Sequence, residues 1–510
     1  MTNKSFYSHY EGSSFIKRLG DFIAQNQSTK IKGFTGSSLS FYFSTIIKRQ
    51  LKPTLFIFNS KEDSLYFLND IETLNPDKQI FYFPETTKEP YSDKEPNNYN
   101  LLQRTELIEH LNFSKNKNSI IVTHLRAISE NQVNKNELIK SSIKLKVDQN
   151  ISFDKLNEQL FELNFRREDF VVEPGEFAVR GGILDIFPYS SQTPYRIEFF
   201  GDEITRIRSF DIESQRSEKN HQSIKIISNI QVSKKSKNIQ NIFDVINDDT
   251  VIYLQCINLF NSEIQKIVEN AKSKFDNSLN KEDLVNPENL FININSVKKQ
   301  LKKFKQVEFD SMSSKINFKL NIQPQPSFNK SFNLLIDDLK NKSLAGYHVS
   351  LCCTNSQQKK RLSQIFEDLN YEDAIDPVIL PLSSGFIDMN EKMVFYTDHQ
   401  IFERYHKFRF RKTFKNKLSI ALKQINSLSK GDYVTHIDHG IGKYVGLQKI
   451  EVDGKMQESM KIIYGDRDVL FLSRAIKILC DFLPTCVWEV ALVVENHPKL
   501  HVRRSRLLIT

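Results

Sequence analysis

The chain has 510 residues, a length that predicts three or four domains rather than one. Its 71 lysines and arginines against 62 acidic residues give a net charge of +9, which favours anionic partners mildly and excludes a histone-like polycation. The sequence has no apolar run of about 18 to 20 residues and no secretion signal at its start, so we expect a cytoplasmic protein without membrane contact.

Residues 1–145 alternate short apolar runs with stretches of helical spacing, which predicts an α/β layer with a mostly parallel sheet. The runs expected to be strands are 54–58, 80–83 and 119–123. The stretches expected to be helices are 15–24, 40–49 and 101–111. Such sheets often bind nucleotides at the carboxyl ends of their strands.

A glycine-rich segment at residues 33–40 follows an expected strand and opens an expected helix, which is the setting of a phosphate-binding P-loop. A working loop needs glycine, lysine and then serine or threonine, but Ser38 and Leu39 stand at the first two of these positions. Without a lysine ammonium, no point charge faces the β- and γ-phosphates. We therefore expect no nucleotide binding and no ATP hydrolysis, although a coincidental glycine-rich turn is the alternative. The residues of this degenerate P-loop are Gly33, Gly36, Ser38, Leu39 and Ser40.

From residue 146 to 235 the sequence changes to short strands separated by Pro-Gly and Gly-Gly turns. This pattern predicts a β-rich domain inserted into the α/β layer. The expected strands are 170–173, 177–180, 183–187, 195–200 and 204–210.

Alternation along residues 195–200 puts Arg196, Glu198 and Phe200 on one face. Because charge marks this face as the solvent face, Phe200 should be an exposed aromatic side chain, as at interface hot spots. A β-bulge at the Gly-Gly turn after Arg180 could turn that side chain toward the same patch. The alternative for Phe200 is a ring tucked under a neighbouring loop.

The α/β pattern returns over residues 236–322, and the proline-rich segment 323–327 is expected to be a linker. Beyond it, residues 328–403 predict a second, small α/β domain. Residues 404–428 are basic and predict a solvated linker helix, with a nucleic-acid contact as the alternative.

Residues 429–475 predict a compact SH3- or Tudor-like β-barrel, because short strands alternate with glycine and aspartate turns. Barrels of this size more often present strand edges to partners than catalyse. The cluster of His436, Asp438 and His439 lacks the convergence of a metal site, and the five cysteines include no CxxC pair, so we expect no metal. No catalytic residues are expected, and residues 476–510 form an atypical tail.

Two segments resemble a family of known function. Residues 173–188 and 195–204 are similar to the UvrA-binding domain shared by UvrB and the Mfd family of transcription-repair coupling factors. Residues 431–444 are similar to the RNA-polymerase-interacting module of the same family, which is related to CarD and which UvrB lacks. Together and in this order, the two modules resemble the N-terminal portion of that family.

The resemblance implies a UvrB-like α/β domain with the UvrA-binding insertion, then a small α/β domain, a linker helix and the polymerase module. It implies UvrA contacts at Arg180, Arg196 and Phe200. It also implies contacts with the RNA polymerase beta subunit at Ile450 and, as a weaker candidate, Lys449. The UvrB-like region of the family has lost its ATP-binding residues, which agrees with the degenerate P-loop.

Family members continue into an ATP-driven DNA translocase, whose motifs are missing from these 510 residues. We therefore expect an adaptor that binds UvrA and RNA polymerase without a cofactor, ATP belonging to the motor of the family. Direct DNA binding is expected to be weak. Because the match stops after Ser473, we expect a frameshift or altered gene end near residue 474. The alternatives are a UvrB-like ATPase or helicase and a CarD-like transcription regulator.

Overall fold

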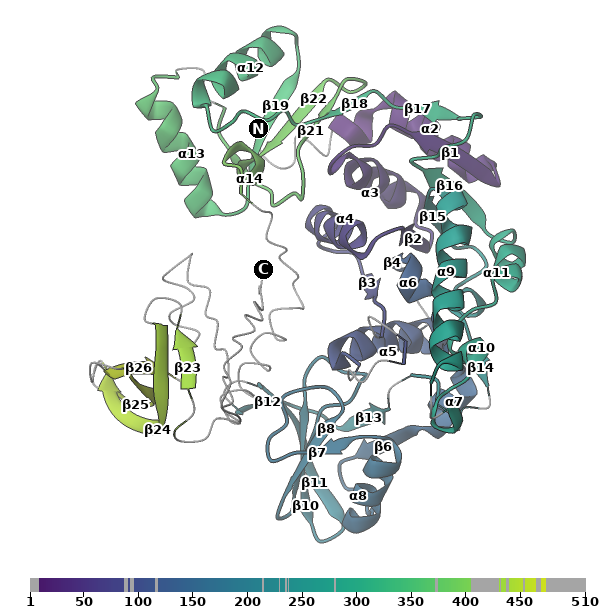
Figure 1. Cartoon of the computed structure of the whole chain (residues 1–510), viewed down its shortest axis with the longest axis vertical. Coiled ribbons are helices and arrows are strands. Elements are labelled where there is room, and N and C mark those ends of the chain that lie inside the picture. Colours follow the sequence, from purple (N-terminus) through teal and green to yellow (C-terminus); the bar gives the residue numbers. More distant parts are fainter. Residues whose placement is uncertain are drawn as a thin grey trace. The chain divides into compact units, whose positions relative to one another are not determined.

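The chain forms two compact units, Met1–Thr413 and Phe414–Thr510. Figure 1 draws the elements of both units in a computed structural model, coloured from purple at the N-terminus to yellow at the C-terminus. The structure describes residues 9–86, 90–91, 96–114, 118–212, 215–228, 230–233, 236, 238–278, 281–371, 375–404, 431, 433–436, 440–452, 455–464 and 469–473.

A seven-stranded sheet organises the first domain, and every neighbouring pair of its strands is parallel, as the sequence predicts. The order across the sheet is β17 (Phe318–Lys319), β1 (Ser28–Lys32), β16 (Lys305–Phe309), β15 (Val251–Gln255), β2 (Thr54–Phe58), β4 (Ile120–His124) and β3 (Ile80–Phe83). The β-rich domain falls in sequence between β4 and β15. Chain on both sides of this insertion therefore completes one sheet.

Helices cover both faces of this sheet. They are α2 (Ser14–Gln25), α3 (Ser38–Gln50), α4 (Lys61–Leu74), α5 (Asn98–Phe113), α6 (Leu125–Ile128), α7 (Lys135–Lys140), α9 (Ile257–Asp276), α10 (Pro287–Leu290) and α11 (Ile294–Leu301). Two 3-10 turns, η1 (Ile242–Asp244) and η2 (Lys281–Asp283), and a short pair, β5 (Gln132–Val133) with β14 (Ile239–Gln240), complete the domain.

The alternation within β2 shows why helices lie on both sides. Phe56 and Phe58 pack in one apolar cluster with residues of α2, α3 and α4. Leu55 and Ile57 pack in a second cluster with residues of α5, α6, α9 and α11. A strand that is apolar on both faces is typical of a parallel sheet buried between two helical layers.

The insertion is a separate β-rich domain, as predicted. Its six-stranded sheet has the order β12 (Ser217–Asn220), β11 (Glu203–Phe210), β10 (Tyr195–Phe200), β9 (Ile183–Ile186), β8 (Glu176–Arg180) and β7 (Arg166–Arg167). A two-stranded sheet of β6 (Ser142–Lys146) and β13 (Ser223–Ile227) accompanies it. Helix α8 (Phe153–Glu162) contributes Leu156 and Leu160 to the apolar cluster that contains Ile197 and Ile207 of the large sheet.

The expected strand at residues 170–173 is wrong. The backbone N–H groups of Val172 and Glu173 donate to Oε2 of Glu176, at 2.9 and 2.8 Å, rather than to a neighbouring strand. Glu176 is fully buried, so its carboxylate needs these donors. The carboxylate of a buried side chain therefore takes the place of the neighbouring strand that the apolar composition of this segment predicts.

A small α/β domain follows, with a mixed five-stranded sheet. The strand order is β18 (Ile322–Pro324), β21 (Phe386–Asp388), β22 (Met393–Thr397), β19 (His348–Cys353) and β20 (Val378–Ile379). Its helices are α12 (Phe332–Leu344), α13 (Ser356–Asp368) and α14 (Asp398–Ile401).

The expected linker at residues 323–327 is also wrong, because part of it forms β18. Pro324 is tolerated there because β18 is an edge strand, where a missing N–H breaks no inner ladder. Gln325 is buried, and its Oε1 accepts from the N–H of Thr397 at 2.8 Å.

The second unit contains a four-stranded antiparallel sheet in sequence order, β23 (Tyr433–His436), β24 (Gly440–Val452), β25 (Lys455–Ile463) and β26 (Val469–Ser473). The expected β-rich module is present as these four strands, but a closed barrel is not shown, since no pairing among the described residues joins β23 to β26. The basic segment beyond Arg404, the side chains of His436, Asp438 and His439, and the tail 476–510 lie outside the described residues. In the part of the chain that the structure describes, none of the helices combines the length and apolarity needed to span a bilayer.

Candidate functional site

Two of the three residues matched to UvrA contacts meet at one buried carboxylate of the insertion. Arg196 on β10 binds Asp185 on β9 through two nitrogens, with Nε to Oδ1 at 2.7 Å and an Nη to Oδ2 at 2.8 Å. Arg180 on β8 reaches the same Oδ2 at 3.0 Å. The side chain of Asp185 is only 1% exposed. One carboxylate therefore orients two guanidinium groups on the same sheet face.

Strand register explains this meeting. Asp185 is directly opposite Arg196 on one side and Ala178 on the other, and Arg180 lies two residues beyond Ala178. Residues two apart on a strand, and residues opposite each other across strands, share a face. The expected bulge after Arg180 is absent: Arg180 pairs with Ile183, and the two glycines form the tight hairpin turn between them.

The two arginines differ in how firmly they are held. Arg196 also donates to the carbonyl of Gln215 at 3.2 Å and lies 4.8 Å from the ring centre of Phe210. Its hydrogen bonds to Asp185 raise the pKa of the guanidinium, so the charge is fixed. Arg180 is 45% exposed and lies over the ring of Phe170. The guanidinium of Arg196 is therefore held by more contacts, whereas that of Arg180 is more exposed to solvent.

Phe200 ends β10 on the same face and is 80% exposed, as the alternation predicts. This exposure excludes the alternative of a ring tucked under a loop. An aromatic side chain beside charges and open to solvent is typical of an interface hot spot. Its role in binding UvrA stays a prediction.

Sequence reasoning missed Asp185 as a site residue. The available signal was a carboxylate between Leu184 and Ile186 in an otherwise apolar strand. A charge in such a position needs a partner, but the sequence does not give the register that brings Arg196 opposite it.

The degenerate P-loop has the expected setting, because it follows β1 and opens α3. One of its backbone N–H groups, that of Ser37, is nevertheless bonded to another domain. Ser37 N donates to the carbonyl of Ser384 at 3.1 Å, and Ser384 N donates to Oγ of Ser37 at 3.1 Å. Leu39 is buried in the apolar cluster that contains other residues of α3. A loop of the small α/β domain thus engages one of the N–H groups that a phosphate at this helix start would need.

The same loop is fastened to α4 and α14. Asp70 accepts from the N–H and the Oγ of Ser383 at 2.7 and 2.6 Å, and His399 Nε2 lies 3.1 Å from the carbonyl of Ser383. We call the contacts of Ser37, Asp70 and His399 with Ser383 and Ser384 the interdomain clamp. The clamp joins the small domain to the first α/β domain.

Substitution of Gly36 should loosen the interdomain clamp. A Cβ at Gly36 would lie 2.6 Å from the carbonyl oxygen of Gly385, and the φ of Gly36 is +55°. Gly201 has a similar φ of +60° but no atom within 4 Å, so Gly201→Ala isolates the backbone strain. We expect Gly201→Ala to cost about 1 kcal/mol and Gly36→Ala about 1 to 3 kcal/mol more. Calorimetry with hydrogen exchange at residues 381–385 measures this, and equal losses would contradict the close approach.

The predicted polymerase contacts fall on one strand of the second unit. Lys449 and Ile450 are neighbours in β24, opposite Glu458 and Gln457 of β25. Their side chains lie outside the described residues, and their roles stay predictions.

Comparison with known families agrees with both modules. Residues 143–231 match the family described as the UvrB interaction domain. Residues 428–474 match the family described as the CarD-like/TRCF RID domain. The chain therefore combines a UvrB-type interaction domain with a CarD-like module.

Whole-chain relatives make the similarity more specific. The chain is 24% identical over 549 residues to a transcription-repair-coupling factor of Bacillus subtilis, covering 90% of this chain and 46% of the relative. A transcription-repair-coupling factor of Borreliella burgdorferi is 22% identical, with 91% of this chain and 44% of the relative covered. The resemblance to transcription-repair coupling factors is thus confirmed. The chain spans less than half the length of the curated relatives it matches.

Proposed function

We propose that this chain is a partner-binding region of a transcription-repair coupling factor, an adaptor that binds stalled RNA polymerase and recruits UvrA in the cytoplasm. The observation that carries the proposal is the presence in one chain of a UvrB interaction domain and a CarD-like/TRCF RID domain. Either domain alone would fit another class of protein.

The UvrA contact is assigned to the face of Arg180, Arg196 and Phe200. Support comes from the geometry: two cations bound to one carboxylate share a sheet face with an aromatic ring that is 80% exposed. Aromatic and arginine side chains are the residue types enriched at hot spots.

Residues 33–40 are proposed to bind no ATP, so the adaptor role needs no cofactor from them. The interdomain clamp supports this, because Ser37 N is bonded to Ser384 and no lysine follows Ser38. DNA-stimulated ATP turnover by the purified chain would instead favour the UvrB-like ATPase or helicase.

Polymerase binding through β24 gives a separate test. Ile450→Asp should weaken binding of the RNA polymerase beta subunit by about tenfold to a hundredfold, as expected for an apolar hot spot, and leave UvrA binding unchanged. Val469→Asp on β26 is the matched control, since Val469 is an apolar residue that is 43% exposed on the same sheet. Biolayer interferometry with purified UvrA and RNA polymerase measures both affinities.

Three results of that assay discriminate the functions. Binding of both partners supports the adaptor. Polymerase binding without UvrA affinity favours a CarD-like transcription regulator. Equal effects of Ile450→Asp and Val469→Asp on polymerase binding would remove Ile450 from the site.

A further inference from the structure

The sheet face that carries Arg196 continues onto β11 with two more arginines. Arg196 is directly opposite Arg208, and Glu198 is directly opposite Arg206. Opposite side chains on antiparallel strands project from the same face. Both additional arginines therefore lie on the face that ends at Phe200.

Among the described residues, the ion pairs on this face engage Arg180, Arg196 and Arg208 but not Arg206. Glu198 stands opposite Arg206 but is ion-paired with Arg208, and Asp185 is bound by Arg180 and Arg196. Arg206 is exposed, and within the described part of the chain it has no ion pair. An exposed guanidinium beside a surface already rich in oriented arginines is available to an acidic partner.

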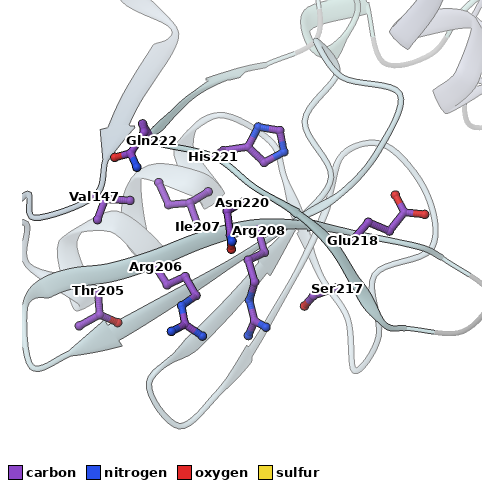
Figure 2. A pocket seen from close by; sticks show the side chains of 10 residues that line it. All are labelled: Val147, Thr205, Arg206, Ile207, Arg208, Ser217, Glu218, Asn220, His221 and Gln222. Atoms are coloured by element: carbon purple, nitrogen blue, oxygen red, sulfur yellow. The ribbon is translucent and has the colours of Figure 1, made fainter.

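Arg206 and Arg208 line a groove of about 550 Å³, together with Asn220 and His221 of the chain that follows β11. Figure 2 shows the two guanidinium groups side by side and pointing the same way. The carboxylate of Glu218, which also lines the groove, turns away from them (Figure 2). Parallel guanidinium groups suit a carboxylate, which can accept from both.

Apolar surface adjoins this arginine pair. Ile183, which is 36% exposed, is directly opposite Glu198, and Phe200 lies two residues beyond Glu198. A protein segment with an acidic side chain next to an apolar one fits such a surface. A DNA backbone fits it poorly, because its phosphates would leave the exposed apolar side chains of Ile183 and Phe200 without a partner.

We propose that Arg206, with Arg208, binds a carboxylate of UvrA and extends the docking face from Phe200 across β11 to the groove. This inference rests on the proposed function and adds a contact to the three that the resemblance implies. It also states the chemistry of the partner: an acidic side chain that follows an apolar contact with Phe200 and Ile183.

Charge reversal at Arg206 tests the proposal in the full chain. Arg206→Ala should weaken UvrA binding by about two- to fivefold, as for an exposed ion pair, and Arg206→Glu by about tenfold or more. Lys155→Glu is the matched control, because Lys155 is an exposed residue of α8, which packs on the opposite face of the sheet. Affinities are measured at two salt concentrations, and the loss from Arg206→Glu should be smaller at high salt.

The outcomes separate this inference from the proposed function. Normal UvrA binding by Arg206→Glu, with binding lost by Arg196→Ala, Phe200→Ala, overturns the Arg206 contact and leaves the proposed function standing. Normal binding by both variants overturns the UvrA site itself. A loss of affinity for a short DNA duplex without any loss for UvrA also overturns the Arg206 proposal.

Discussion

The double variant Arg196→Ala, Phe200→Ala should bind UvrA about a hundredfold more weakly than the unmodified chain, because each residue has the character of a hot spot. Phe200 offers an aromatic ring that is 80% exposed, so a partner can bury nearly all of it. Arg196 offers a guanidinium whose orientation is fixed by Asp185 before binding. Isothermal titration with purified UvrA measures the change.

The two single variants should differ in stability while sharing the binding defect. Phe200→Ala should leave the melting temperature unchanged, since the ring makes little contact with the folded domain. Arg196→Ala removes two hydrogen bonds from the buried carboxylate of Asp185, whose remaining partner among the described residues is Arg180, and should cost about 1 to 3 kcal/mol. A purely structural role for both residues would instead lower stability in both variants.

Two further variants control for charge and aromatic content. Lys155→Ala, Phe161→Ala removes a cation and an exposed aromatic ring from α8, on the opposite face of the sheet, and should bind UvrA normally. Arg196→Lys keeps the charge but cannot bind both oxygens of Asp185 in fork geometry, so binding should be only partly restored. UvrA binding by the double variant at the affinity of the unmodified chain would falsify the site.

The packing of strands between helical layers was predictable from the sequence, because it depends on the spacing of apolar residues along each short segment. The apolar run that became β2 is buried on both faces, and the alternation in β10 correctly placed Phe200 in solvent. Both features follow from the residues of one strand. The order of apolar and polar residues along a single strand therefore sufficed to predict which of its side chains are buried and which are exposed.

Contacts between distant segments were not predictable in the same way. Asp70 and Ser383 are 313 residues apart, and no local pattern marks either as a partner of the other. The segment around Pro324 has the composition of a linker, yet its backbone pairs with β21. The register that joins Arg196 to Asp185 is also set by the turn and the core rather than by either strand alone.

The interdomain clamp should respond to pH through Asp70 and His399 in opposite directions. Burial raises the pKa of Asp70 to about 6, from 3.8, and lowers the pKa of His399 to about 4, from 6.5. The contribution of Asp70 to the stability of the clamp is complete below its ordinary pKa of 3.8, where the carboxyl group is neutral in the folded and open states. It is lost as pH rises through the folded pKa of about 6. For His399, the contribution is complete above pH 6.5 and is lost as pH falls toward 4.

Each pKa shift corresponds to about 3 kcal/mol of clamp stability. In the unmodified chain the two pH dependences have opposite signs and cancel. A variant that removes one of the two groups should therefore show the pH dependence of the other. Asp70→Asn keeps an acceptor for the N–H of Ser383 and a donor for its Oγ but carries no buried charge. Relative to this variant, the unmodified clamp should lose about 3 kcal/mol between pH 4 and 7. Relative to His399→Gln, which can still donate to the carbonyl of Ser383, it should lose a similar amount between pH 6.5 and 4.

Hydrogen exchange at the amides of Ser37, Ser383 and Ser384 measures these changes locally, which matters because a chain of several domains does not unfold in one step. Comparing variants at the same pH removes the intrinsic pH dependence of exchange. Parallel protection profiles for the unmodified chain and Asp70→Asn would show that Asp70 has the same pKa in the folded and open states. If protection instead rises with pH in Asp70→Asn and falls with pH in His399→Gln, the stability of the clamp in the unmodified chain is nearly constant between pH 4 and 6.5. The reason is that Ser383 is held from one side by a carboxyl group and from the other by a neutral imidazole.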